Sequence, residues 1–387
     1  MHDEPAARAA ALTSADDAFG ADLYRLLSRD ASDTVFSPFS VNSTLRMAMC
    51  GAGGRTAAEL AGALHLDLSQ PDGWADAAAE GLREMSALVS DVTADGTLTL
   101  RAPGTLWVQS GLPLRPQFTA RLVDTAAAAL ADADFRGAPE AARSEINRVV
   151  AEQTAGKITG LLQADAIHAD TRLVLTSAIY LKAGWADTFP EKATADEPFY
   201  PDGPGRPSVT VRMMHGSAAR PYLRGDGYQA VVLPYRGGGL AMAVVLPDGP
   251  LETLRPRIAA GGMRGLLARA SRYQVTLSMP RFRIETALGL VPVLQRLGVT
   301  EAFTGRADFT GITDATRLAI GAVAHKAYVD VDEQGTEAAA ATAVTFQRLA
   351  AFRAPPRVTV RVDRPFLFAI IHTATSTPLF LGQVSHP

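Results

Sequence analysis

The sequence contains a single cysteine, Cys50, among 387 residues, so one chain can form no internal disulfide. Its formal net charge of −3 gives no electrostatic reason to expect binding to nucleic acid or to an anionic membrane. No run of about 18 apolar residues occurs, so no transmembrane helix is expected. The first twenty residues lack the apolar stretch of a signal peptide. The expected location is therefore either the cytoplasm or, for a mature form, outside the cell.

Motifs for metal binding, nucleotide binding and covalent catalysis are also missing. The seven histidines include no pair at helical metal-ligand spacing, and a zinc site is not expected with one cysteine. The G-x-S-x-G motif of many hydrolases is absent. The glycine-containing strings at 51–56 and 154–159 lack residues that phosphate-binding loops require, and we interpret them as turns. The sequence thus predicts no enzyme, no cofactor and no metal site.

Helical patterns are concentrated in the first 160 residues. Apolar residues recur at helical spacing over 14–27 and again over 144–157, where Gly156 is a plausible stop signal. Thr56 and Glu59 have the spacing of a capping box and predict the start of another helix.

Strand patterns dominate the rest of the chain. Residues 172–185 are apolar on both faces, as in a strand at the centre of a sheet. Helices first and strands later favour an α+β fold with large, mostly antiparallel or mixed sheets. No linker or internal repeat divides the chain, so we expect a single domain over residues 1–387.

A long connection separates two strand-like segments near the carboxyl end. Residues 327–332 and 357–362 alternate as strands do, and the connection between them, 333–356, exceeds the ~12–15 residues usual in compact domains. Its alanine run has high helix propensity, so a surface helix is one interpretation. However, Gly335 and Thr336 are poor caps, and no large apolar residue marks a face that could dock.

The second interpretation of this connection is a strand held ready for insertion. Small inner residues would let it enter a core that is already packed, where a larger side chain would cost about 1–3 kcal/mol. Gly335 would act as the hinge, because glycine tolerates large changes of φ and ψ. One face of the strand would point inward, and the other outward. The inner face would carry Thr336, Ala338, Ala340, Thr342, Val344 and Phe346, and the outer face Glu337, Ala339, Ala341, Ala343, Thr345 and Gln347.

This stretch resembles the hinge of an inhibitory serpin, and the resemblance extends over nearly the whole chain. Other matching strings follow in the family's order, and their joint occurrence is far more specific than any one of them. They include VFSPFSVNSTL (35–45), LTSAIYLKAGW (175–185), LSMPRFRIE (277–285), VAHKAYVDVDEQG (323–335) and RPFLFAIIHTATSTPLFLGQVSHP (364–387).

The resemblance implies a serpin fold, with a large mixed central sheet, two further sheets, about eight to nine helices and an exposed reactive-centre loop at about 333–356. It also implies an irreversible suicide-substrate inhibitor that supplies no catalytic group. A serine protease would cleave the loop and remain bound as an acyl-enzyme while the hinge inserts as a new central strand. Ladder hydrogen bonds of a strand of about 12 residues would contribute on the order of 10 kcal/mol. The uncut protein would then be a kinetic trap and a monomer at risk of loop–sheet polymerisation.

Family spacing counted from Glu333 places the scissile bond at Leu349–Ala350, which suits chymotrypsin-, elastase- or subtilisin-like proteases. A hinge one residue shorter would select Arg348 and a trypsin-like target, and Phe352 and Arg353 are minor candidates. The residues that match the family's hinge are Glu333, Gly335, Thr336, Glu337, Ala338, Ala339, Ala340, Ala341 and Thr342.

Two further sites follow from the resemblance. Ser37, Ser40 and His325 match the buried polar cluster called the shutter, and Trp185 matches the breach where insertion begins. Ser177 occupies a shutter position that is asparagine in most relatives, so the hydrogen bonds there are expected to differ.

A non-inhibitory serpin acting as a carrier or chaperone is the alternative function. Such relatives usually carry bulky, charged or proline residues in the hinge. Residues 336–343 contain none of these except Glu337.

Overall fold

The computed structural model describes residues 4–28, 32–67, 69, 73–123, 128–337 and 355–387. In these ranges the chain forms eight α-helices, and most of them precede most of the strands, which confirms the α+β prediction. The helices are α1 (Glu4–Leu27), α2 (Pro38–Met49), α3 (Gly54–Ala63), α4 (Trp74–Thr93), α5 (Pro116–Val123), α6 (Pro139–Gln153), α7 (Arg255–Leu267) and α8 (Val291–Arg296).

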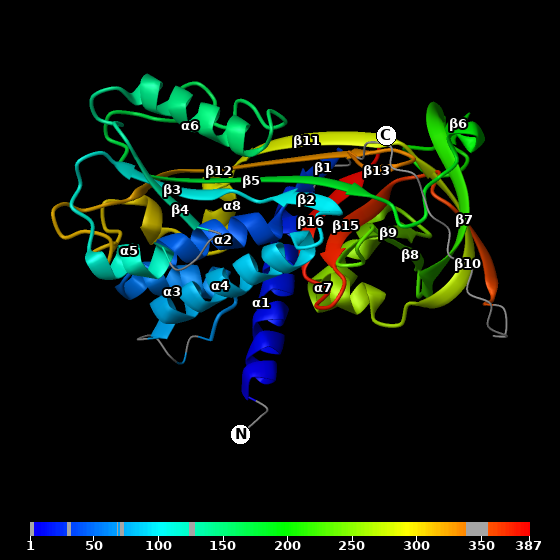
Figure 1. Cartoon of the computed structure of the whole chain (residues 1–387), viewed down its shortest axis with the longest axis horizontal. Coiled ribbons are helices and arrows are strands. Elements are labelled where there is room, and N and C mark those ends of the chain that lie inside the picture. Colours follow the sequence, from blue (N-terminus) through cyan, green and yellow to red (C-terminus); the bar gives the residue numbers. More distant parts are fainter. Residues whose placement is uncertain (1–3, 29–31, 68, 70–72, 124–127, 338–354) are drawn as a thin grey trace.

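A mixed sheet of seven described strands forms the long upper layer in Figure 1. Helix α6 covers its outer face, and α2–α5 lie beneath it (Figure 1). In spatial order the strands are β11 (Phe282–Gly289), β12 (Ile320–Val331), β13 (Gly335–Thr336), β5 (Leu173–Gly184), β3 (Gly104–Gln109) and β4 (Ala128–Ala133), with β2 (Leu98–Arg101) also paired to β5.

The remaining described strands form a second sheet of nine strands. The resemblance predicted two further sheets, but the 17-residue strand β7 takes part in both and joins them through hydrogen bonds. The order is β1 (Thr34–Phe36), β16 (Pro378–Val384), β15 (Phe366–His372), β9 (Leu240–Pro247), β8 (Tyr228–Pro234), β7 (Val209–Gly225), β10 (Ser271–Pro280) and β14 (Arg357–Arg361), with β6 (Ala195–Phe199) paired to β7.

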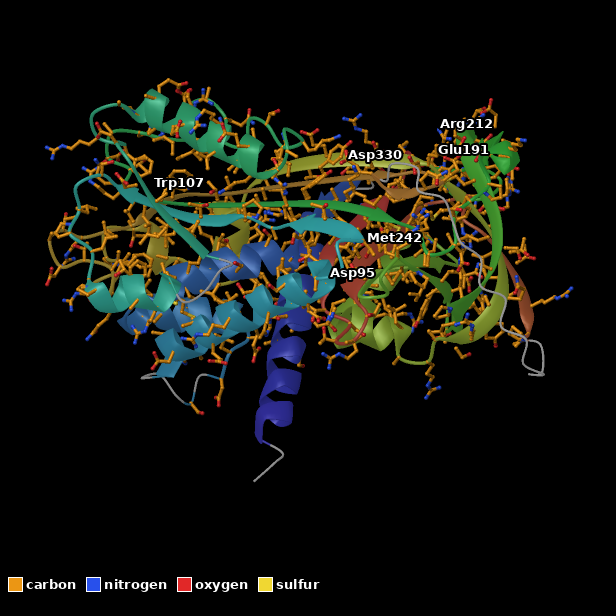
Figure 2. The ribbon with its side chains drawn as sticks, in the orientation of Figure 1. Asp95, Trp107, Glu191, Arg212, Met242 and Asp330 are labelled. Carbon is orange, nitrogen blue, oxygen red and sulfur yellow. The ribbon has the colours of Figure 1, made fainter. Side chains whose placement is uncertain are left out.

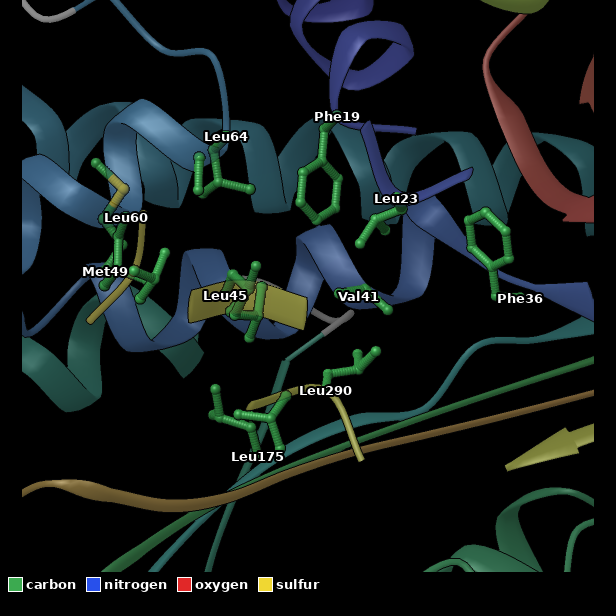
Figure 3. Close-up of a cluster of buried hydrophobic side chains, with 14 of the residues drawn as sticks. Phe19, Leu23, Phe36, Val41, Leu45, Met49, Leu60, Leu64, Leu175 and Leu290 are labelled. Atoms are coloured by element: carbon green, nitrogen blue, oxygen red, sulfur yellow. The ribbon is translucent and has the colours of Figure 1, made fainter. Parts of the chain in front are cut away.

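Apolar side chains fill the space between these layers. Figure 3 shows one cluster, in which Phe19 of α1, Leu45 of α2 and Leu60 of α3 meet Leu175 of β5. Another cluster lies under α6, where Trp107 of β3 packs among the helix's buried residues (Figure 2). Strand β5 is buried along almost its whole length because it has packed layers on both faces, as its continuous apolar sequence predicted.

The capping-box prediction at Thr56 is wrong. Helix α3 begins at Gly54, and Gly53 is its N-cap, so Thr56 lies inside the helix. Its hydroxyl instead accepts a hydrogen bond of 2.9 Å from the amide of Asp308. The carboxylate of Glu59 accepts one of 2.7 Å from the amide of Thr300. Both side chains that the local pattern assigned to a helix cap therefore form hydrogen bonds to residues distant in sequence.

The predicted end of α6 is confirmed. The helix stops at Gln153, and Gly156 has a φ of 76°. The amide of Gly156 donates to the carbonyl of Ala151 at 2.7 Å, which closes the helix end. At its other end α6 starts at Pro139, earlier than the pattern indicated, because proline is favourable in the first turn.

Candidate functional site: a hinge inserted at one end of the central sheet

The first hinge residues lie between β12 and β5. Gly335 pairs with Gly184, and Thr336 pairs with Ala183 of β5 and Val331 of β12, always antiparallel. Elsewhere β12 and β5 pair directly and in parallel, from Ile320–Leu173 to Ala327–Ile179. The sheet therefore opens at one end, and β13 occupies the opening.

Gly335 fits this position because its backbone lies very close to β5. A β-carbon added there would lie 2.1 Å from the carbonyl oxygen of Ala183 and 2.7 Å from the α-carbon of Gly184. Its φ of 156° is also unfavourable for residues with a side chain. The glycine predicted as a hinge is thus required for β13 to enter the sheet.

Thr336 contacts an aromatic pair beneath the opening. Its hydroxyl lies 2.6 Å from the Tyr235 hydroxyl, and both residues are fully buried. Tyr235 stacks on Trp185 with 4.6 Å between ring centroids. The Trp185 indole donates to the carbonyl of Asp332 at 2.9 Å. Trp185, predicted at the breach, therefore lies directly beside the entering hinge.

Glu333 is tied to the neighbouring strands just before the hinge. Its side chain is 3% exposed, and its carboxylate lies 2.7 Å from the Arg281 guanidinium and accepts a hydrogen bond from the Thr194 hydroxyl. Burial raises the pKa of this carboxyl, but the hydrogen bonds from Arg281 and Thr194 outweigh burial and leave the pKa of Glu333 below its usual value. The glutamate is thus held ionised.

Glu337 marks the point where the chain leaves the sheet. Its φ is 49°, unusual for a residue other than glycine, and its amide donates to the carbonyl of Asp330 at 3.0 Å. Asp330 lies near the hinge end of the sheet in Figure 2. The Glu337 carboxylate lies 2.7 Å from Lys157, in the turn after α6. Thr336 faces Tyr235, whereas Glu337 faces Lys157 and its backbone is no longer that of a strand.

The four predicted shutter residues are brought together under the middle of the sheet. The His325 imidazole accepts a hydrogen bond at Nε2 from the Ser37 amide, at 2.9 Å. The ring proton therefore lies on Nδ1, which donates a hydrogen bond to Ser177 Oγ, also at 2.9 Å. Ser40 donates to the carbonyl of Ala178 at 3.0 Å. Burial lowers the pKa of His325 to about 3, so the ring is neutral.

The remaining predicted residues lie outside the described part of the chain. They are Ala338, Ala339, Ala340, Ala341, Thr342, Arg348, Leu349 and Ala350, together with the minor candidates Phe352 and Arg353. Four residues that complete the hinge contacts were not predicted from the sequence. They are Lys157, Thr194, Tyr235 and Arg281, which come from distant segments and carry no local motif.

The described residues contain no group of three or more histidine, cysteine, aspartate or glutamate side chains placed to hold a metal ion. No helix within the described ranges combines the length and apolar character needed to cross a bilayer. Around β13 the described residues show a two-residue strand paired with β12 and β5 and held by polar contacts of Thr336 and Glu337.

Comparisons with known proteins agree with this geometry. The model of the family described as Serpin (serine protease inhibitor) matches residues 14–387. A leukocyte elastase inhibitor of Sus scrofa is 36% identical over 392 residues, covering 97% of this chain and 99% of that protein. An uncharacterised serpin-like protein of Thermococcus kodakarensis is 36% identical over 379 residues, covering 97% and 86%.

Solved structures share the fold over almost the full length. Human thyroxine-binding globulin matches with a TM-score of 0.85 at 27% identity, covering 98% of this chain and 99% of that one. A serpin of the insect Tenebrio molitor matches with a TM-score of 0.82 at 28% identity, covering 97% and 98%. The fold is therefore the serpin fold, and the chain belongs to the serpin family.

Proposed function

We propose that this protein is an irreversible suicide-substrate inhibitor of serine proteases. The target's nucleophilic serine attacks a carbonyl of the reactive-centre loop and releases the amine of the next residue. The resulting ester links the protease to the new carboxyl end of the hinge segment. The hinge then continues into the central sheet before water can hydrolyse the ester. The chain supplies the strand and no catalytic group.

The position of β13 supports this proposal most directly. Gly335 and Thr336 already pair with β5, in the direction that a longer inserted strand would take. The residues that follow Glu337 are alanine and threonine up to Ala343. Small side chains lower the cost of entering a packed layer. Each new residue would replace one direct β12–β5 contact by ladder bonds on both edges.

The scissile bond is proposed as Leu349–Ala350, with Arg348 as the alternative residue. An apolar residue before the cut suits proteases with a chymotrypsin-, elastase- or subtilisin-like pocket. Relatives named leukocyte elastase inhibitors support this target class. Arg348 would instead favour a trypsin-like protease.

A carrier function is the second candidate, because human thyroxine-binding globulin, solved with its ligand, has the same fold. The hinge composition favours inhibition, since residues 338–343 contain no charge, proline or bulky side chain. A carrier needs no such composition.

The deciding experiment is incubation of the full chain with chymotrypsin, elastase, subtilisin and trypsin. We expect a covalent complex that survives SDS with at least one of the first three, and mass spectrometry of the released peptide identifies the bond. Ala340→Arg places a charge in the inserting segment and should convert the protein into an ordinary substrate. Ala354→Arg, after the proposed bond, is the matched control and should still form the complex. Cleavage in the loop with no complex for the unaltered chain would contradict inhibition.

A further inference from the structure

Strands β7, β10 and β14 form one end of the nine-stranded sheet, and one face of this end is largely exposed. Figure 1 shows β7 and β10 at the end of the molecule opposite α5. Side chains alternate between the two faces, and Val275, Leu277 and Val360 are buried on the inner one. The outward positions are paired across the three strands in three rows, which are Ala219–Gln274–Arg357, Ser217–Thr276–Thr359 and His215–Ser278–Arg361.

This outward face carries positive charge, and none of its positions is a carboxylate. Arg272 lies just beyond the first row, opposite Pro221 of β7. Arg272 and Arg357 are both exposed, and neither forms an ion pair with any residue that the structure describes. Arg361 in the third row differs, because the carboxylate of Glu197 lies 2.6 Å from it. Positive charge that no neighbouring carboxylate balances is therefore concentrated at the Arg357 end of the face.

The surface beside these arginines is hydrophilic and built from short side chains. Gln274 Nε2 donates to Ser217 Oγ at 3.0 Å, and the hydroxyls of Ser217 and Thr276 lie 3.4 Å apart. The face has no large apolar side chain that could be buried against a partner. It therefore suits a polar partner surface, and its arginines attract carboxylates.

The reactive-centre loop ends at this face. The carbonyl of Pro356 accepts a hydrogen bond of 2.9 Å from the amide of Gln274. Arg357 follows Ala350 by seven positions, so the chain can separate it from the proposed scissile bond by at most about 25 Å. A single-domain protease is roughly 40 Å across. A protease bound at that bond therefore reaches this face with the part of its rim that lies beside the residues after the cut.

We propose that the outward face of β7, β10 and β14 docks the target protease through carboxylates on that part of its rim, and this inference rests on the proposed function. Arg272 and Arg357 attract those carboxylates before the loop is cut, so they raise the rate of encounter. The target is thus a protease with an apolar pocket for Leu349 and an acidic rim beside the residues after the cut.

The face belongs to the nine-stranded sheet, whereas the hinge enters the other sheet. Docking should therefore change how fast the protease reacts with the loop. It should leave unchanged the fraction of cleavage events that ends in a covalent complex, because that fraction depends on insertion. This separation gives a readout that a defect in insertion would not reproduce.

The test compares two proteases on three forms of the full chain. The proteases are chymotrypsin and a chymotrypsin variant with two glutamates added to the rim beside the residues after the cut. The forms are the unaltered chain, Arg272→Gln/Arg357→Gln, and the matched control Arg296→Gln/Arg306→Gln. Arg296 and Arg306 are also exposed, but they belong to α8 and the segment that follows it, in the other half of the molecule (Figure 1).

The second-order rate constant of loop cleavage is measured at about 25 mM and about 250 mM NaCl. At low salt we expect the added glutamates to raise it about fivefold for the unaltered chain and the control, but less than about twofold for Arg272→Gln/Arg357→Gln. High salt should remove most of the gain. The number of inhibitor molecules consumed for each protease inactivated should be the same for all three forms. Circular dichroism confirms that each form is folded.

Each other outcome has a definite meaning. An equal gain in all three forms, or no gain in any, would overturn the docking face. Loop cleavage without a covalent complex, but with the expected charge dependence, would keep the face and contradict the proposed inhibition. A loop that chymotrypsin, elastase, subtilisin and trypsin all leave uncut would contradict both. Retention on heparin that only Arg272→Gln/Arg357→Gln loses, together with equal rate constants, would assign the face to a polyanion and overturn the proposal.

Discussion

The Glu337 carboxylate lies 2.7 Å from the Lys157 ammonium group, at the point where the hinge leaves the sheet. The two residues come from segments far apart in sequence, and the Glu337 side chain is only 8% exposed. Glu337 also has a φ of 49°, which a strand residue cannot keep. Further insertion must therefore change both its backbone and the surroundings of its charge.

This ion pair should slow insertion. Because Lys157 is 45% exposed, the pair contributes only about 0.5–1 kcal/mol. Glu337→Gln keeps the shape and removes the charge. Annealing of a synthetic peptide of residues 336–349 into the uncut protein, followed by the rise in thermal midpoint, should become about two- to fivefold faster. Added salt should speed annealing of the unaltered chain more than that of the variant. Glu145→Gln, which breaks an exposed ion pair within α6, is the control and should leave the rate unchanged. Equal rates for all three proteins would remove this role.

Gly335→Ala should expel β13 from the sheet. The new β-carbon would overlap the backbone of Ala183, which cannot move without disrupting β5. Hydrogen exchange should show lost protection at the Thr336 amide, and emission from Trp185 should shift as its surroundings loosen. Gly289→Ala in β11 is the matched control, since no atom lies within 4 Å of its added β-carbon. Retained protection at Thr336 in Gly335→Ala would show that the hinge does not depend on this contact.

Acid should favour opening of the sheet through His325. Burial lowers the pKa of this histidine to about 3, against 6.5 for an exposed one. Between these values the opened or unfolded protein binds a proton that the closed protein excludes, so stability falls as pH decreases below 6.5. At pH 5 the loss is about 2 kcal/mol, or up to about 30-fold in unfolding rate.

Unfolding rates in urea at pH 7.5 and pH 5 measure this effect. His325→Gln should flatten the dependence, because its side chain has no proton to gain. His65→Gln, at a partly exposed histidine, should retain it. An acceleration of the same size in His325→Gln would assign the pH dependence to other groups.

Cleavage within the loop should stabilise the protein. If the hinge segment then inserts, its ladder bonds contribute on the order of 10 kcal/mol, which for a chain of 387 residues corresponds to a rise in thermal midpoint on the order of 10 °C. Differential scanning fluorimetry before and after limited digestion with subtilisin measures the change. Ala340→Arg, cut at the same bond, should show little rise. An unchanged midpoint for the unaltered chain would mean that the uncut sheet stores no free energy.

Much of the fold could be predicted because its signals are local. The continuous apolar run of β5 predicted a strand with both faces covered, and Gly156 predicted the end of α6. The small residues and the glycine of the long connection allowed either a surface helix or an inserting strand, and the resemblance to the family favoured the strand. A short stretch of sequence carries such signals, because the conformation of its own backbone and the burial of its own side chains leave a mark on residue choice.

The contacts of the candidate site were less predictable because they join distant segments. Lys157 lies in a string that indicated only a turn, and its partner is fixed by the placement of α6 over the sheet. The direct bond from His325 to Ser177 depends on the register between β12 and β5, which pairs those two residues. Thr56 shows the opposite error, since a local motif was present but a tertiary partner used its hydroxyl.

The opening that β13 occupies at one end of the β12–β5 pair gives the proposed insertion a single direction. Separation can advance only from the end that β13 already holds open, because the other end is closed by paired backbone and covered by α6. Strand β5 is 12 residues long, and an extended strand of that length spans roughly 40 Å. A group bonded to the advancing end would be translocated by about that distance. Each molecule would then act once, and the length of one strand would set how far the bonded group moves.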